Sequence, residues 1–177
     1  MKKNIIGIDP GASGALSKIL AGKDTVACYK CPVDVKDRVL VLQDGLRKNV
    51  ETCAYIEKVH AMPHDGRSSL FKFGVNYGAW LGILESNTNV HKLVEVSPQK
   101  WMNYWQDKLG IKFPRDKIDR KRKIKEIAGA FINGKATLWN ADSILITMYG
   151  YHSEYKSTME GADNEWRIPS VKRGAEK

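Results

Sequence analysis

Three acidic residues of the chain lie in segments that are otherwise apolar. Asp9 ends the run "IIGID" ahead of a turn of small residues, Glu57 is embedded in "AYIEKV", and Asp142 lies in "NADSILIT". A carboxylate is costly to bury unless a cation, a donor network or a metal ion compensates it. Singly, each acid has an ordinary explanation: hydrogen bonds could satisfy it, and Asp142 could cap a helix N-terminus, where the helix dipole favours negative charge.

Three such acids in elements far apart in the sequence suggest that the fold brings them to one site. Clustered carboxylates repel one another and raise one another's pKa unless a divalent cation neutralises them. Carboxylate oxygens suit Mg²⁺ or Mn²⁺, and two such ions about 3.5–4 Å apart can bind a scissile phosphate and activate the attacking water. The pattern therefore predicts a site for two divalent ions, with Asp9, Glu57 and Asp142 as ligands.

The elements that must position these acids are short strands and amphipathic helices. Apolar runs predict strands at 4–9, 15–20, 26–31, 53–59 and 89–98, with a hairpin turn at 21–24. Helical spacing predicts helices at 36–50, 68–86, 99–105, 121–132 and from about 140 to 149, with Ser68 or Ser69 capping the second. The order, with no internal repeat or linker, favours one α/β domain at 1–152 followed by a charged tail at 153–177.

Positive charge is concentrated in one stretch of the 177 residues. The net charge is +9, and residues 111–125 hold eight Lys or Arg against Asp116 and Asp119. A solvated helical face is the ordinary explanation of a charge run. This density in a basic protein favours a polyanionic partner instead, with nucleic acid first among them.

The sequence favours a cytoplasmic protein. No apolar run approaches the roughly 20 residues that span a bilayer, and the apolar stretch near the N-terminus ends at Asp9, too early for the core of a signal peptide. The three cysteines leave one unpaired in any disulfide scheme. Cys28 and Cys31 form a CxxC without a second metal-binding pair, so we interpret them as ordinary reduced thiols.

Three glycines form a stripe on the predicted helix 68–86. Gly74, Gly78 and Gly82 recur every fourth residue and so share one helical face. Because each glycine costs a helix roughly 0.5–1 kcal/mol relative to alanine, the stripe suggests close approach of another backbone. Packing against the protein's own sheet and contact with a second subunit are equally consistent with the pattern.

Four blocks of the sequence, in this order, resemble the RuvC family of Holliday-junction resolvases, and most closely its compact bacteriophage-type members. They read "IIGIDPGASGAL", "YIEKVHAMPHDGRSSLFKFGVNYGAWLG", "VEVSPQKW" and "ADSILIT", and together span residues 4–150. The first block is weakly specific by itself, whereas the ordered combination is highly specific. The resemblance implies an RNase H-like fold with a mixed five-stranded sheet flanked by helices, a homodimer, and Mg²⁺- or Mn²⁺-dependent nicking of two opposed strands at a four-way DNA junction.

The resemblance also implies roles for particular residues. Asp9, Glu57 and Asp142 match the family's catalytic acids, and Lys121, with Lys117 close behind, matches a lysine that contacts the scissile region. The helix that carries Gly74, Gly78 and Gly82 matches the family's dimer helix, which favours a subunit contact for the stripe. The residues expected to bind DNA are His60, His64, Arg67, Lys112, Arg115, Lys117, Arg120, Lys121, Arg122 and Lys123.

Two positions depart from the family pattern. Where members carry a further metal ligand, Asp or His, three residues before the last acid, this chain has Trp139; Asn140 could serve as a neutral ligand, or a water could substitute. Three residues after the strand glutamate, some members place a phenylalanine that wedges against junction bases. Here that residue is His60, which could stack on a base or be an ordinary surface residue.

Three other functions compete with junction resolution. "GIDPGASG" also resembles the first phosphate loop of actin-like and sugar-kinase ATPases, but that architecture is a duplicated domain usually far longer than this chain, and a second glycine-rich loop is missing. A catalytically weak protein of the same fold could bind branched DNA without cutting it; the retained acids argue against this. The enzyme could also act on flaps, three-way junctions or forks.

Overall fold

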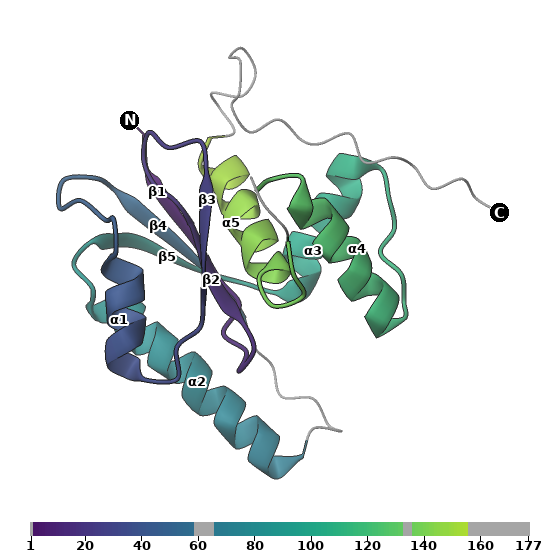
Figure 1. Cartoon of the computed structure of the whole chain (residues 1–177), viewed down its shortest axis with the longest axis horizontal. Coiled ribbons are helices and arrows are strands. Elements are labelled where there is room, and N and C mark those ends of the chain that lie inside the picture. Colours follow the sequence, from purple (N-terminus) through teal and green to yellow (C-terminus); the bar gives the residue numbers. More distant parts are fainter. Residues whose placement is uncertain (1, 59–65, 133–135, 156–177) are drawn as a thin grey trace.

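The computed structural model describes residues 2–58, 66–132 and 136–155, which form five strands and five helices (Figure 1). The strands are β1 (Asn4–Ile8), β2 (Ala15–Ile19), β3 (Val26–Lys30), β4 (Thr52–Glu57) and β5 (Val90–Val96). The helices are α1 (Val35–Gln43), α2 (Arg67–Ser86), α3 (Pro98–Leu109), α4 (Lys117–Gly129) and α5 (Ala141–Glu154). The predicted α/β class and the five predicted strands are confirmed.

One mixed sheet holds the strands in the order β3-β2-β1-β4-β5. β1 is antiparallel to β2 and parallel to β4, and β4 is parallel to β5. All five residues of β1, in the middle of the sheet, are buried, as its continuous apolar run predicts. Ile8 at the end of β1 lies opposite Ile56 of β4. Because the two strands run in the same direction, Asp9 and Glu57 follow at the same edge of the sheet.

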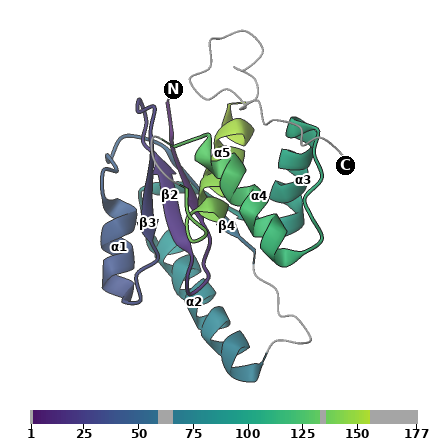
Figure 2. The same ribbon diagram turned by 45° about the vertical axis from the view of Figure 1, so that its right-hand side comes forward.

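Helices cover both faces of the sheet (Figures 1 and 2). α1 and α2 lie on one face, over a core that includes Ile6, Leu42 and Trp80. α3, α4 and α5 lie on the other, over a core that includes Ile5 and Trp105. Successive residues of β1 therefore enter opposite cores, as the period of a strand requires. Among the described residues no helix is both long and apolar enough to cross a membrane.

α5 packs unusually close to the sheet. A Cβ at Gly7 of β1 would lie 2.4 Å from the backbone nitrogen of Thr147, so only glycine fits there. Gly150 allows the same approach from the helix side, because its Cβ would lie 2.5 Å from the ring of Tyr55. The Thr147 hydroxyl lies 3.1 Å from the backbone oxygen of Ser17, its hydrogen-bond acceptor in β2. These contacts fix α5 across β1, β2 and β4.

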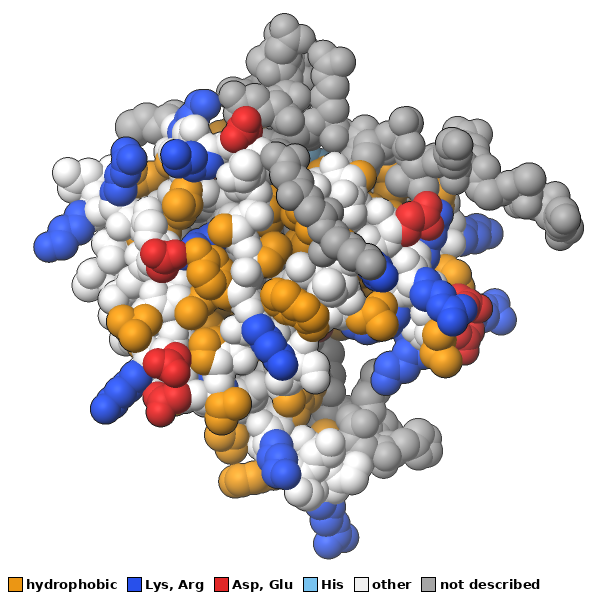
Figure 3. All heavy atoms as spheres, viewed as in Figure 1, with side chains coloured by type: hydrophobic (Ala, Val, Ile, Leu, Met, Phe, Trp, Pro, Cys, Tyr) orange, Lys and Arg blue, Asp and Glu red, His pale blue; other side chains and the backbone are white. Residues whose placement is uncertain are grey.

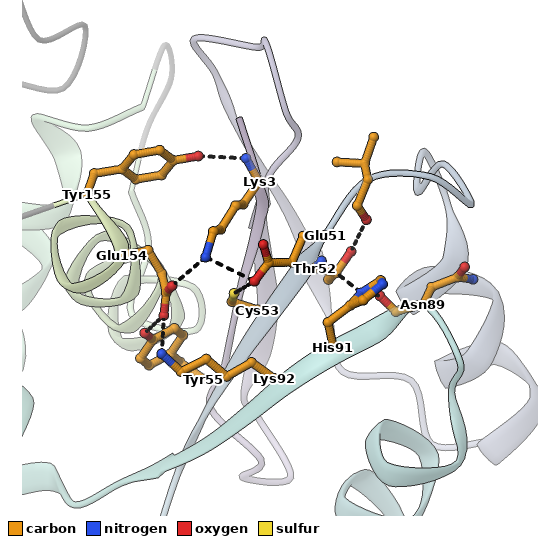
Figure 4. Close-up of polar contacts among 11 residues, drawn as sticks. Lys3, Glu51, Thr52, Cys53, Tyr55, Asn89, His91, Lys92, Glu154 and Tyr155 are labelled. Carbon is orange, nitrogen blue, oxygen red and sulfur yellow. Dashed lines mark hydrogen bonds and ion pairs between the residues drawn. The ribbon is translucent and has the colours of Figure 1, made fainter. Parts of the chain in front are cut away.

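The C-terminal end of α5 is held by an ion-pair cluster at Glu154 (Figure 4). This carboxylate, 5% exposed, pairs with Lys3 at 3.1 Å and with Lys92 at 2.7 Å, and it accepts a hydrogen bond from the Tyr55 hydroxyl at 2.6 Å. Burial would raise the pKa of Glu154, but the bonds from Lys92, Tyr55 and Lys3 outweigh it and hold the pKa at about 2. One carboxylate thus ties the helix to the start of β1, to β4 and to β5.

Capping residues explain where two helices differ from the prediction. α4 begins at Lys117 rather than at 121, because the Asp116 carboxylate accepts hydrogen bonds from two amides of the first turn. α3 runs to Leu109 rather than to 105, and it ends at Gly110, whose left-handed conformation (φ 62°) suits glycine. Both helices are therefore bounded by residues just outside the predicted segments.

The remaining boundaries also need correction. α2 begins at Arg67 with Gly66 as N-cap and no side-chain cap, so the predicted cap at Ser68 or Ser69 is wrong. α1 ends at Gln43 instead of reaching 50, and α5 continues past 149 to Glu154. The predicted tail, 153–177, therefore begins inside α5; beyond Tyr155 it lies outside the described residues.

The close approach at Gly7 can be tested by adding one methyl group. We expect Gly7→Ala to lower the free energy of unfolding by at least about 2 kcal/mol, because overpacking at a rigid backbone contact forces the helix outward. Gly129→Ala in α4 is the control, since its Cβ would meet only the Ala136 Cβ at 3.8 Å. Urea denaturation measures both; equal stability of Gly7→Ala and wild type would contradict the packing described.

Glu154 generates a prediction about acid stability. We expect Glu154→Gln to lower the free energy of unfolding by about 2 kcal/mol at pH 7. Since the folded-state pKa of about 2 lies below the usual value for glutamate, the stabilisation is complete above about pH 4.5 and is lost as the pH falls toward 2. Denaturation curves of wild type and variant should therefore converge over that interval.

The control for this comparison is Glu126→Gln. Glu126 is 55% exposed and pairs with Lys123 at 2.9 Å on the surface of α4, so its loss should change stability by less than about 0.5 kcal/mol. A constant difference between Glu154→Gln and wild type from pH 7 down to pH 2 would show that the charge of Glu154 is not what holds the helix.

Candidate active site

The turn after β1 orients the carboxylate of Asp9. The backbone N–H of Gly11 donates to Asp9 Oδ1 at 3.0 Å, and the amide of Asp9 donates to the carbonyl of Ala15 at 2.9 Å, where β2 begins. A Cβ at Gly14 would lie 2.1 Å from the Asp9 carbonyl oxygen, so the chain can reverse here only with glycine. The small residues after Asp9 therefore serve to fold the chain tightly around the acid.

Glu57, the last residue of β4, is held by a tryptophan. The indole N–H of Trp101 in α3 donates to Glu57 Oε1 at 3.0 Å, and Trp101 is only 2% exposed. α3 starts with Ser97 as N-cap, whose side chain accepts from the Lys100 amide, and this fixes the helical position of Trp101. Trp101 was not among the residues predicted for the site. The available signal was the "SPQKW" stretch, a cap followed by proline and an aromatic residue on the first turn.

Asp142 lies in the first turn of α5 and is 6% exposed. Its Oδ2 forms an ion pair with the Lys121 ammonium of α4. Its Oδ1 is buried and has no hydrogen-bond partner among the described residues. Because α5 begins at the edge of the sheet where β1 and β4 end, it brings Asp142 to Asp9 and Glu57.

The pKa shifts show that the three acids act on one another. Burial raises the pKa of Asp9, repulsion from Asp142 raises it further, and the Gly11 amide and Lys121 oppose the shift. Burial likewise raises the pKa of Glu57, to about 8, with further contributions from Asp9 and Asp142 and opposition from Trp101 and Lys121. Charges from β1, β4 and α5 thus meet at one edge of the sheet.

Lys121 is the counter-charge at this edge. Burial would lower its pKa, but attraction by Asp142, Asp9 and Glu57 outweighs burial and raises it. Because its pKa is raised, Lys121 stays charged at neutral pH, and its ammonium beside the three acids reduces their mutual repulsion. Of the two lysines that the sequence offered for this place, Lys121 is the one that contacts an acid; Lys117 is exposed at the start of α4.

The donors gathered here fit a hard divalent cation in their chemistry. Three carboxylates supply the oxygens that Mg²⁺ and Mn²⁺ prefer, and Asp142 Oδ1 is buried without a donor in the described part of the chain. One oxygen of each acid, however, is engaged by Gly11, Trp101 or Lys121. In residues with described placement, no three acidic, histidine or cysteine side chains are so arranged that they could hold an ion. Ligation by all three acids would therefore require side-chain rotation.

Asn140 has another partner in this structure. It is 5% exposed, and its Oδ1 accepts hydrogen bonds from the amide and the hydroxyl of Thr137 at 2.7 and 2.9 Å. These bonds brace the loop that leads into α5. Asn140 could contribute this oxygen to a metal ion only by releasing Thr137; Trp139, at the position where the family has a ligand, is partly exposed.

The predicted DNA-binding residues that the structure describes lie mostly on and before α4, where Figure 3 shows lysine and arginine side chains gathered with a few acids. Those that are exposed are Arg67, Lys112, Arg115, Lys117 and Arg122; Arg120, Lys121 and Lys123 are partly exposed. Arg122 pairs with Asp119 at 3.1 Å, and Lys123 with Glu126 at 2.9 Å. His60 and His64 lie outside the described residues.

The glycine stripe of α2 does not pack against the described part of the sheet. Gly74, Gly78 and Gly82 are exposed, and among the described residues a Cβ at any of them would meet open space. Phe71 and Val75 beside them are 74% and 56% exposed. The face of α2 that packs on the sheet instead carries Trp80, Ile83 and Leu84. Packing on the protein's own sheet, one of the two explanations of the stripe, is therefore excluded for these residues.

Comparison with known proteins shows the fold. No family model matches the sequence, and no curated protein matches it either. Two solved structures are similar over 88% of this chain and 96% of theirs: a Thermus thermophilus RuvC (TM-score 0.52, 19% identity) and T. thermophilus RuvC in complex with a Holliday junction substrate (TM-score 0.53, 14% identity). The chain therefore has the RNase H-like fold with a mixed five-stranded sheet that the RuvC resemblance implied.

Proposed function

We propose that the protein is a metal-dependent endonuclease that resolves four-way and other branched DNA junctions by paired nicking. The observation that carries this proposal is the meeting of Asp9, Glu57 and Asp142 at one edge of an RNase H-like sheet, where their charges act on one another. The bacteriophage-type blocks of the sequence support it. So does the fold, since one protein that shares it is the RuvC solved with a Holliday junction.

Mg²⁺ or Mn²⁺ is the proposed cofactor, with two ions held by Asp9, Glu57 and Asp142, and with Asn140 as a further ligand once its oxygen leaves Thr137. When bound, the ions would supply charge stabilisation of the scissile phosphate and a lowered pKa of the attacking water. The protein holds the three acids against their repulsion: Trp101 fixes Glu57, and the turn after β1 fixes Asp9.

The basic residues of α4 and of the segment before it would hold the DNA backbone. They are close to the acids, because Lys121 of the same helix already contacts Asp142. Lysine and arginine contacts to phosphates release counterions, so binding should weaken steeply with salt. Arg67, exposed at the start of α2, would lie on the junction side of the site under this proposal, and His60 and His64, outside the described residues, are further proposed DNA contacts.

A homodimer would place two such sites for two opposed strands. The exposed face of α2, with Gly74, Gly78, Gly82, Phe71 and Val75, is the proposed subunit contact, because glycines allow a partner backbone to approach closely. The apolar side chains beside the stripe would be buried by the partner.

One test of the nuclease proposal uses a labelled four-way junction with Mg²⁺ or Mn²⁺. Wild type should nick two opposed strands, and Asp9→Asn and Glu57→Gln should each lower the cleavage rate at least about 100-fold, because each removes a charged ligand. The affinity of both variants for the junction, measured by band shift without added metal, should stay within a few-fold of the wild-type affinity. The control is Asp107→Asn, which removes an exposed acid of α3.

Two results would contradict the proposal in different ways. Cleavage by Asp9→Asn at the wild-type rate would remove the acids from the mechanism. Binding of the junction by wild type without cleavage, in either metal, would favour the alternative: a branched-DNA-binding protein of the same fold. The engagement of Asn140 by Thr137 is the observation that keeps this alternative in the test.

The dimer proposal is tested by placing a charge on the stripe. Gly78→Glu should leave the monomer folded, since the position opens into free space within the described chain, and should shift a dimer toward monomer in sedimentation equilibrium. Gln99→Glu, an exposed change in the first turn of α3, is the control. A wild-type protein that stays monomeric at tens of micromolar, or a Gly78→Glu protein that dimerises as tightly as wild type, would contradict the contact.

A further inference from the structure

Asn76, in the middle of α2, reaches the turn that carries Asp9. Its side-chain amide Nδ2 donates to the carbonyl oxygen of Pro10 at 2.8 Å, across 66 residues of sequence. Pro10 directly follows Asp9, so this bond holds the peptide unit next to the candidate metal ligand. This hydrogen bond plays no part in the metal and DNA contacts proposed above.

A buried arginine fixes the orientation of that amide. Arg38 of α1 is 5% exposed; its guanidinium donates to Asn76 Oδ1 through Nη2 and to the Asn76 carbonyl through Nη1 at 3.3 Å. Its Nε donates to the Pro32 carbonyl at 2.8 Å, and the guanidinium carbon lies 5.5 Å from the ring centre of Trp80. Because the amide oxygen faces a permanent donor, the NH₂ group must face Pro10. α1 and α2 lie side by side on this face of the sheet (Figures 1 and 2).

A cavity of about 330 Å³ lies between the turn and α2, beside this hydrogen bond. Its lining consists of Ala12, Ser69, Leu70, Lys72, Phe73 and Asn76. Within the part of the chain that the structure describes, the turn and the helix are therefore not closely packed at this point. The hydrogen bonds within the turn, such as that from the Gly14 amide to the Gly11 carbonyl at 2.9 Å, fix its shape but not its place on the helix.

We propose that Asn76 is a positioning residue for the candidate active site: it holds the Pro10 carbonyl against α2 and so sets where the Asp9 carboxylate lies, with Arg38 orienting its amide. The inference rests on the proposed nuclease function. It adds Asn76 to the residues that serve this function. Asn76 lies on α2, and the opposite face of α2 is the proposed subunit contact. Displacement of a reacting group by about 1 Å can cost on the order of 100-fold in rate, so one hydrogen bond at this place is enough to matter.

Asn76→Asp separates the two hydrogen bonds that the Asn76 side chain makes. The carboxylate has the same shape and still accepts from Arg38, so the buried guanidinium keeps its partner. It cannot donate to the Pro10 carbonyl, and it places an oxygen opposite that oxygen instead. Ser69→Ala, which changes the lining of the same cavity one helical turn or more away, is the matched control. Asn76→Ser, too short to reach Pro10, is a second variant that carries the test if Asn76→Asp fails to fold.

We expect Asn76→Asp to lower kcat for junction cleavage about 10- to 100-fold, with KM and metal-free junction binding within about three-fold of wild type. Amide hydrogen exchange of residues 11–15, measured without metal or DNA, should become faster in the variant, while exchange in β4 and α5 stays unchanged. A role in overall stability alone would instead speed exchange throughout the sheet, and it would lower kcat only in proportion to the loss of folded protein.

The outcomes separate this inference from the function on which it rests. If wild type cleaves and Asn76→Asp matches it in kcat, or if exchange at 11–15 does not change, the positioning role is wrong and the nuclease proposal stands. If wild type does not cleave, the nuclease proposal fails, and unchanged exchange would then remove the structural part of the inference as well. Loss of kcat with faster exchange confined to the turn supports it.

Discussion

The burial of three acids, Asp9, Glu57 and Asp142, at one edge of the sheet is the constraint on which the rest of the structure depends. Burial is the largest cause of the raised pKa of Asp9 and Glu57, and like-charge repulsion adds to it. Each acid accepts a hydrogen bond from one donor: Asp9 from the Gly11 amide, Glu57 from the Trp101 indole and Asp142 from the Lys121 ammonium. Those donors come from three separate elements, so α3 and α4 have to be placed as accurately as the acids themselves.

The placement of Asp142 depends on how α5 is fixed along its middle and at its C-terminal end. Its first turn carries Asp142, while Glu154 at its far end is bonded to three strands or their starts. Between them, Gly7 lets the backbone of α5 at Thr147 approach β1 directly, and Gly150 leaves room for the ring of Tyr55. A helix that touches backbone along its middle and is clamped at its end cannot slide, so its N-terminal turn stays at the edge where β1 and β4 finish.

The acids and the strands could be predicted from the sequence for a physical reason. A carboxylate at the end of an apolar run, such as Asp9, is costly to bury unless a cation or hydrogen-bond donors compensate it. Helix ends were harder to predict, because Gly66 caps α2 without any side-chain bond, and Asp116 competes with neighbouring acids as a possible cap. The side-chain hydrogen bonds that support the acids could not be predicted. Trp101 on Glu57 and Asn76 on Pro10 join residues 44 and 66 positions apart, and no local pattern encodes such pairs. The stripe on α2 had two explanations because periodicity defines a face and not its neighbour.

The ion pair between Lys121 and Asp142 supplies a positive charge to the acids from within the chain. Because this positive charge is covalently part of the polypeptide, a newly made chain can close its sheet edge without waiting for the supply of an ion. A divalent ion bound as proposed would have to displace this ammonium from Asp142. An intramolecular counter-ion of this kind lets the three acids lie together in the folded chain before any cation is added.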